Sequence, residues 1–197
     1  MKRSRADEFP GDMTARQTKD AYSMLPTLGL DWAFLRPVKT SDLARWLTYL
    51  QGDAVRQGIS WRPQRVDELE EFVNAASFEE GARQLRFAIA LQSDDSLIGT
   101  VGLHSIVRDH RSAEIAYDIH PTHWGRGLAS AACEAVTHWA RTKGLFRIQA
   151  TALEDNKASI RVLERCGFKQ EGVLRGYRWV DGAARTSLVF SNVPGDA

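Results

Sequence analysis

Three apolar segments separated by short polar turns constrain the fold of this chain more than any other feature. They are Leu85–Leu91, Leu97–Val107 and Ala113–Ile119, and their aliphatic and β-branched residues favour strands. The connections carry the turn residues Ser93–Ser96 and the charged run Arg108–Arg111. Because connections this short join antiparallel neighbours, we expect the three strands to form a meander.

Strand and helix patterns continue on both sides of this meander. Before it, the sequence predicts a strand ending at Arg36-Pro37, a helix with apolar residues at helical spacing from Leu43 to Leu50, and a second helix from about Val66 to Glu80. The later elements are a helix over Gly127–Lys143, a strand over Phe146–Leu153, a helix over Asn156–Cys166, and strands over Phe168–Leu174 and Arg185–Phe190. The resulting order, β-α-α-β-β-β-α-β-α-β-β, predicts an α/β (α+β) fold with helices on the faces of a central mixed sheet.

Length and charge predict one domain without a nucleic acid partner. The chain has 197 residues, which suits a single domain. The first 24 residues lack a sustained apolar period, so we predict a mobile tail at 1–24 and one domain at 25–197. The formal net charge is +1, and the tail accounts for it. Proteins that bind polyphosphate backbones usually have a larger basic excess.

Membrane, secretory and metal-binding signals are missing from the sequence. No apolar segment approaches the ~20 residues needed to cross a bilayer, and the basic N-terminal residues precede no apolar signal segment. The two cysteines, Cys133 and Cys166, lack the spacing of a metal site. We therefore predict a cytoplasmic protein with no metal and no membrane partner. Cys133, within the predicted long helix, is expected to be a residue of the hydrophobic core.

The segment His120–Ser130, between the meander and the long helix, predicts an anion site. Gly125 and Gly127 let the backbone approach a ligand closely. The unpaired N–H groups and the positive dipole end of the helix favour a phosphate, and Arg126 adds a positive charge. The alternative is an ordinary strand-to-helix turn, because the glycines match neither a Walker loop nor a dinucleotide fingerprint.

Two motifs in the correct order resemble a known family. Glu114–Pro121 (EIAYDIHP) followed by Trp124–Ala129 (WGRGLA) resembles the acetyl-CoA-binding segment of the GNAT acetyltransferases. It looks most like the RimJ/RimL type, which acetylates the N-termini of ribosomal proteins. Asn156–Phe168 is similar to the family's N-x-x-S…L-x-x-x-G-F signature. The first motif departs from the family at one position, because Trp124 stands where the family often has Arg or Gln. The resemblance covers about residues 28–190 and implies a mostly antiparallel sheet, splayed at the acetyl-CoA site.

The resemblance implies acetyl-CoA as cosubstrate, with its pantetheine arm between the strands Ala113–Ile119 and Phe146–Leu153. It assigns these residues to the cosubstrate: Tyr117, Asp118, Ile119, Trp124, Gly125, Arg126, Gly127, Leu128, Ala129, Ser130 and Asn156. The alternative for Trp124 is an aromatic that anchors the loop without touching CoA. In this family the pantetheine pairs with backbone groups, and no acetyl-enzyme forms.

The resemblance also implies catalytic roles for two residues. Glu114 would accept the proton of the amine, the alternative being an ion pair with Arg108 or Arg111. His104, on the neighbouring strand, is a second candidate base on the substrate side, or a structural histidine. Ser159 would assist the leaving thiolate, because Leu163 stands where many members have a tyrosine. Asn156 and Ser159 also match a helix cap and its first turn.

The acceptor is less constrained than the donor. Trp61 resembles an aromatic of the substrate wall in the RimJ/RimL type, and Arg62, Tyr177, Arg178 and Trp179 are further candidates. We expect direct acetyl transfer to a primary amine, namely a protein N-terminal α-amino group. A small-molecule amine is the alternative acceptor, and a non-catalytic CoA-binding protein is a third interpretation. The sequence leaves a monomer and a homodimer equally open.

Overall fold

A seven-stranded sheet forms the centre of the computed structural model, which describes residues 25–195 apart from 74, 77, 79 and 80. The predicted tail, residues 1–24, lies outside the described residues. The strands are β1 (Ala33–Pro37), β2 (Leu85–Leu91), β3 (Leu97–Val107), β4 (Ser112–Ile119), β5 (Arg147–Leu153), β6 (Lys169–Val180) and β7 (Ala183–Asn192). They lie in the order β1-β2-β3-β4-β5-β7-β6.

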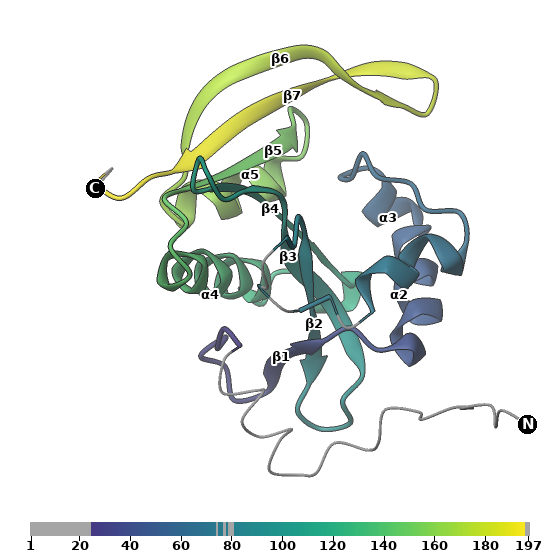
Figure 1. Cartoon of the computed structure of the whole chain (residues 1–197). Coiled ribbons are helices and arrows are strands. Elements are labelled where there is room, and N and C mark those ends of the chain that lie inside the picture. The colour runs from purple at the N-terminus through teal and green to yellow at the C-terminus, as the bar shows by residue number, and fades with distance from the viewer. Residues whose placement is uncertain (1–24, 74, 77, 79–80, 196–197) are drawn as a thin grey trace, which may run out of the picture.

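Helices cover both faces of this sheet. The α-helices are α2 (Leu43–Leu50), α3 (Asp53–Arg56), α4 (Leu128–Thr142) and α5 (Lys157–Arg165). The 3₁₀ helices are η1 (Thr40–Asp42), η2 (Val66–Phe72) and η3 (Pro121–His123). Figure 1 shows α4 on one side of the sheet and α2 with α3 on the other, while β6 and β7 form a long hairpin. None of the helices in the described part of the chain is long and apolar enough to cross a membrane.

The register of the sheet creates a gap between two central strands. The predicted meander is confirmed, since β2, β3 and β4 pair antiparallel in succession. By contrast, β4 and β5 run parallel and pair over Ser112–Glu114 with Arg147–Gln149. Beyond this point β4 continues to Ile119 and β5 to Leu153 without pairing to each other. The predicted splayed, mostly antiparallel sheet is therefore confirmed.

The period of two along each strand separates two apolar cores. Ile115 and Ile119 of β4 pack with Cys133 and other buried residues of α4, as expected for a core cysteine. On the opposite face, Trp46 of α2 and Phe72 of η2 belong to a second buried cluster. Alternation along β4 therefore directs Glu114 and Asp118 toward the α2 side, and Tyr117 toward the α4 side.

Three elements differ from the sequence prediction. The predicted helix over 66–80 is the short 3₁₀ helix η2, followed by extended Val73; the residues at 74, 77, 79 and 80 lie outside the description. Leu69 and Phe72, three residues apart, align on one face of a 3₁₀ helix. The short helix α3 was not predicted. The last hairpin is longer than expected, since β6 runs to Val180 and β7 begins at Ala183. Asp181 and Gly182 between them take the positive φ of a tight two-residue turn.

Candidate active site

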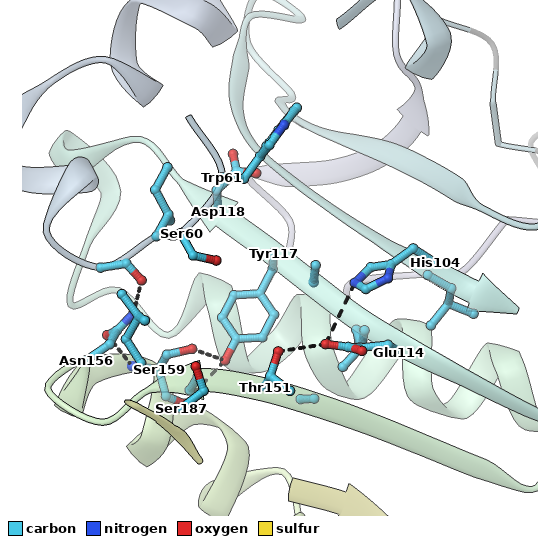
Figure 2. A pocket seen from close by; sticks show the side chains of 18 of the residues that line it. Ser60, Trp61, His104, Glu114, Tyr117, Asp118, Thr151, Asn156, Ser159 and Ser187 are labelled. Carbon is cyan, nitrogen blue, oxygen red and sulfur yellow. Dashed lines mark hydrogen bonds and ion pairs between the residues drawn. The ribbon is translucent and has the colours of Figure 1, made fainter. Parts of the chain in front are cut away.

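A cavity of about 450 Å³ opens where β4 and β5 diverge. Its walls come from both strands, from β2 and β3, from α5, and from the segment between α3 and η2. Eight of the candidate residues named from the sequence line this cavity: Trp61, His104, Glu114, Tyr117, Asp118, Asn156, Ser159 and Arg178. In Figure 2, Tyr117 lies between the pair Glu114 and His104 on one side and Asn156 with Ser159 on the other.

Glu114 stands at the last paired position of β4, where the strands begin to separate. Its side chain is buried and accepts hydrogen bonds from Thr151 Oγ1 at 2.7 Å and Gln149 Nε2 at 3.4 Å. His104 is its register partner on β3, and His104 Nε2 lies 4.0 Å from Glu114 Oε1. The structure thus places the two candidate bases together at the opening of the gap.

The surroundings of His104 favour its neutral form. Burial lowers the pKa of the imidazole, and the charges of Arg86 and Arg178 lower this pKa further, while Glu114 raises it. His104 Nδ1 lies 3.1 Å from the Ser105 hydroxyl. An imidazole with a lowered pKa is uncharged at neutral pH, so it has a free lone pair for a proton.

A second polar group lies across the gap. The Tyr117 hydroxyl lies 2.9 Å from Ser159 Oγ, and burial raises the pKa of Tyr117. The Asn156 side chain caps α5 by accepting from Ser159 N at 3.0 Å, and it donates to the Gly58 carbonyl at 2.7 Å. Asn156 is therefore a helix cap and a cavity residue at once. The Tyr117 hydroxyl was missed in the sequence, where this residue was assigned through its backbone.

Asp118 has a different environment from Tyr117. Its carboxylate accepts hydrogen bonds from Thr100 Oγ1 at 2.6 Å, from Trp46 Nε1 at 3.2 Å and from the Tyr49 hydroxyl. Burial raises the pKa of Asp118. Because Trp46 and Tyr49 belong to α2, this carboxylate fastens α2 to the sheet. The side chain thus performs a structural task, on the opposite face of β4 from Tyr117.

The loop before α4 has the shape expected of a phosphate site. Gly125 and Gly127 have φ of +74° and +76°, and a Cβ built on either would meet nothing within 4 Å. No side chain in the described part of the chain caps the start of α4, so its first N–H groups remain available. Leu128, Ala129 and Ser130 form that first turn. These features fit the diphosphate of CoA.

Aromatic contacts hold this loop in place. Trp124 is half exposed, and its indole N–H donates to the Ile119 carbonyl at 2.7 Å, which fixes the loop to the end of β4. The Arg126 guanidinium lies 4.1 Å from the centre of the Trp32 ring. Trp124 therefore anchors the loop, and Arg126 keeps its charge at the surface beside Gly125 and Gly127.

The rest of the site contains two residues that the sequence did not single out. Thr151 orients Glu114, and Arg86 lines the cavity from β2. A charged residue in the otherwise apolar run Leu85–Leu91 was an available signal for Arg86. Among the residues that the structure describes, no group of three or more His, Cys, Asp or Glu side chains could hold a metal ion.

Comparison with known proteins decides the family. A family model described as an acetyltransferase (GNAT) domain matches residues 33–169. The chain belongs to the GNAT acetyltransferase family. The GNAT relative YoaA of Bacillus subtilis, an uncharacterized N-acetyltransferase, is 34% identical over 176 residues, covering 86% of this chain and 98% of that protein. The resemblance found in the sequence is thus confirmed, and the protein is an N-acetyltransferase.

Two solved structures that contain CoA are similar to this chain. Mycobacterium smegmatis RimJ, in complex with CoA-disulfide, has a TM-score of 0.71 and 26% identity, covering 86% of this chain and 85% of that one. Vibrio cholerae spermidine N-acetyltransferase, in complex with CoA and spermine, has a TM-score of 0.73 and 25% identity, covering 85% and 98%. The similarity to GNAT enzymes therefore leaves the acceptor class open.

Proposed function

We propose that this enzyme transfers the acetyl group of acetyl-CoA directly to the α-amino group of a protein N-terminus. The observation that carries the proposal is the pair Glu114 and His104, 4.0 Å apart, at the point where β4 and β5 separate. A base at this position lies beside the gap that the fold leaves for the pantetheine arm. Acetyl-CoA supplies the thioester, and the chain itself supplies the proton transfers.

The donor side of the proposal rests on the loop and the gap. The N–H groups around Gly125 and Gly127 would bind the diphosphate, since nothing in the described structure occupies the space above these glycines. Beyond Glu114 the edge of β4 that faces β5 no longer pairs with it, and the backbone groups of this edge would pair with the pantetheine as an added strand does. A backbone N–H there would polarise the thioester carbonyl.

The proton of the attacking amine would go to the Glu114–His104 pair. The carboxylate of Glu114 accepts it, and neutral His104, whose Nε2 lies 4.0 Å from Glu114 Oε1, takes the proton on from there. The new C–N bond forms as the C–S bond breaks, and Ser159 Oγ passes a proton to the departing thiolate. Ser159 regains a proton from solvent, to which the Glu114–His104 pair releases the one taken from the amine. Tyr117 hydrogen-bonds Ser159, which orients that hydroxyl.

The charges of the cavity favour a peptide over a polyamine. Its lining holds two carboxylates, Glu114 and Asp118, against two arginines, Arg86 and Arg178. Asp118 already accepts three hydrogen bonds, and Glu114 is needed for the proton. A polyamine would bring further ammonium groups, and the described lining offers them no carboxylate beyond these two. Similarity to the spermidine enzyme keeps a small amine as the alternative acceptor.

The test is thiol release from acetyl-CoA with N-terminal peptides, spermidine and small amines as acceptors. We expect peptides to be acetylated with the highest kcat/KM; a preference for spermidine would overturn the peptide assignment. We expect Glu114→Gln to lower kcat by roughly 100-fold or more, the usual contribution of a general base. The matched control is Glu164→Gln on the exposed surface of α5, which should match wild type. Tight CoA binding without turnover of any amine would instead indicate a non-catalytic protein.

A further inference from the structure

Arg86 is a buried cation on the cavity wall without a carboxylate partner. It is 8% exposed, and Arg86 Nη1 donates to the Ala116 carbonyl at 3.0 Å and to Thr100 Oγ1 at 3.5 Å. Arg86 Nε is buried and has no hydrogen-bond partner among the described residues. Within that part of the chain, no carboxylate forms an ion pair with this guanidinium. A guanidinium has five N–H donors, so most of its capacity remains unused.

The sheet is built to bring this guanidinium toward β4. Arg86 of β2 pairs with Gly102 of β3, and Gly102 pairs with Ala116 of β4. Paired residues on neighbouring strands point to the same face, so the Arg86 side chain passes over Gly102, where no side chain stands. A Cβ on Gly102 would lie 2.1 Å from the Leu85 carbonyl oxygen. The close strand approach and the path of Arg86 thus both depend on glycine.

The charge of Arg86 is compensated only indirectly. Thr100 bridges it to Asp118, because the Thr100 hydroxyl donates to Asp118 Oδ2 at 2.6 Å. Phe72 and Trp46 flank the guanidinium, with ring centres 5.5 and 6.0 Å from its carbon. Burial lowers the pKa of Arg86, although Asp118 opposes this effect. A buried guanidinium with free donors is suited to a ligand carboxylate, which it binds through parallel hydrogen bonds.

Arg86 and the proposed base lie at a defined separation on one face. Glu114 and Ala116 are two residues apart on β4, and Arg86 binds the Ala116 carbonyl. Two residues of a strand span roughly 7 Å. When the amino group of an acceptor peptide lies beside Glu114, the side chain that reaches Arg86 would therefore belong to the first or second residue of that peptide.

We propose that Arg86 selects acceptor peptides that carry an aspartate or glutamate side chain within their first two residues. The inference rests on the proposed function, since it takes the amine position beside Glu114 as given. A polyamine would place its next ammonium near Arg86, and repulsion between like charges would oppose its binding. Arg86 thus acts as a specificity-determining residue for the acceptor.

The experiment compares kcat/KM for two peptides that begin with Ala-Asp and Ala-Asn. They differ only in the side-chain carboxylate of Asp and the side-chain amide of Asn. The variants are Arg86→Met, Arg86→Lys and the control Arg65→Met, an exposed arginine that pairs with Asp67. We expect wild type and Arg65→Met to prefer the Asp peptide by about tenfold, equivalent to one lost ion pair. Arg86→Met should bring the ratio near one, and Arg86→Lys should keep part of it. The ratio cancels any general loss of activity from imperfect folding.

The outcomes separate this inference from the proposed function. Peptides acetylated without regard to the acidic residue, or an unchanged ratio in Arg86→Met, would overturn the role of Arg86 alone. Spermidine turnover in the absence of peptide turnover would overturn the proposed function as well. A preference for free aspartate over the Ala-Asp peptide, lost in Arg86→Met, would support carboxylate binding by Arg86 and overturn the peptide source.

Discussion

The substitution Gly127→Ala separates phosphate binding at the loop from the stability of the fold. Gly127 has a φ of +76°, where an L residue costs about 1–2 kcal/mol. The smaller conformational freedom of alanine in the unfolded chain offsets about 0.4–1 kcal/mol. A built Cβ meets nothing within 4 Å, so no clash adds to this cost. We therefore expect the free energy of unfolding to fall by about 1 kcal/mol, which lowers Tm by roughly 2–4 °C for a chain of this size.

The same methyl group should have a larger effect on CoA binding. It projects into the space above the loop where the backbone N–H groups would meet a diphosphate. A hydrogen bond to a charged group contributes about 1.5–3 kcal/mol. Losing one such bond raises the Kd for CoA by roughly 10- to 100-fold. Isothermal titration of CoA measures this change directly, and thermal unfolding of the same sample measures stability.

Gly144→Ala is the matched control, because Gly144 ends the same helix. Its φ is +87°, and a Cβ there also meets nothing within 4 Å. The variant should lose the same stability and bind CoA like wild type. If Gly127→Ala also binds CoA like wild type, the loop is not the phosphate site. If both variants bind CoA equally weakly, the effect comes from strain in α4 and the reasoning fails.

Further measurements test the rest of the structure. Arg147 and Ser191 hold the pKa of Glu171 down to about 2, from its usual 4.5. Glu171→Gln should therefore lower the free energy of unfolding above pH 4.5, by about 1 kcal/mol or less for so exposed a pair. The difference should vanish as the pH falls toward 2, and urea unfolding that shows a constant difference would contradict the assignment. Ser159→Ala should lower kcat by roughly tenfold or more as a lost proton donor, and an unchanged kcat would show that the thiolate leaves unaided. Gly102→Ala forces β2 and β3 apart at a 2.1 Å contact and should cost about 1–3 kcal/mol; an unchanged Tm would refute this.

The sequence predicted the fold more completely than the site. The strands of the meander and the helix after Gly127 follow from alternation, helical spacing and glycine positions, all of which are local. The helix predicted over 66–80 was wrong because Leu69 and Phe72 suit a 3₁₀ turn as well as an α-helix. For the site, the resemblance indicated Glu114 and Ser159. Spacing along the sequence could not predict that Thr151 would hydrogen-bond Glu114 or that the Tyr117 hydroxyl would hydrogen-bond Ser159.

What the sequence determined by itself is local geometry. Short turns make consecutive strands antiparallel neighbours. The period of two decides which side chains share a face, so Glu114 and Asp118 must lie on the opposite face of their strand from Tyr117.

Tertiary structure alone decided which of these side chains meet. Thr151 reaches Glu114 across 37 positions of sequence, and Ser159 reaches Tyr117 across 42. Arg86 stands over Gly102 because three strands align in one register. The contacts of Glu114 and Tyr117 lie where β4 stops pairing with β5, and no local pattern of the sequence encodes that point.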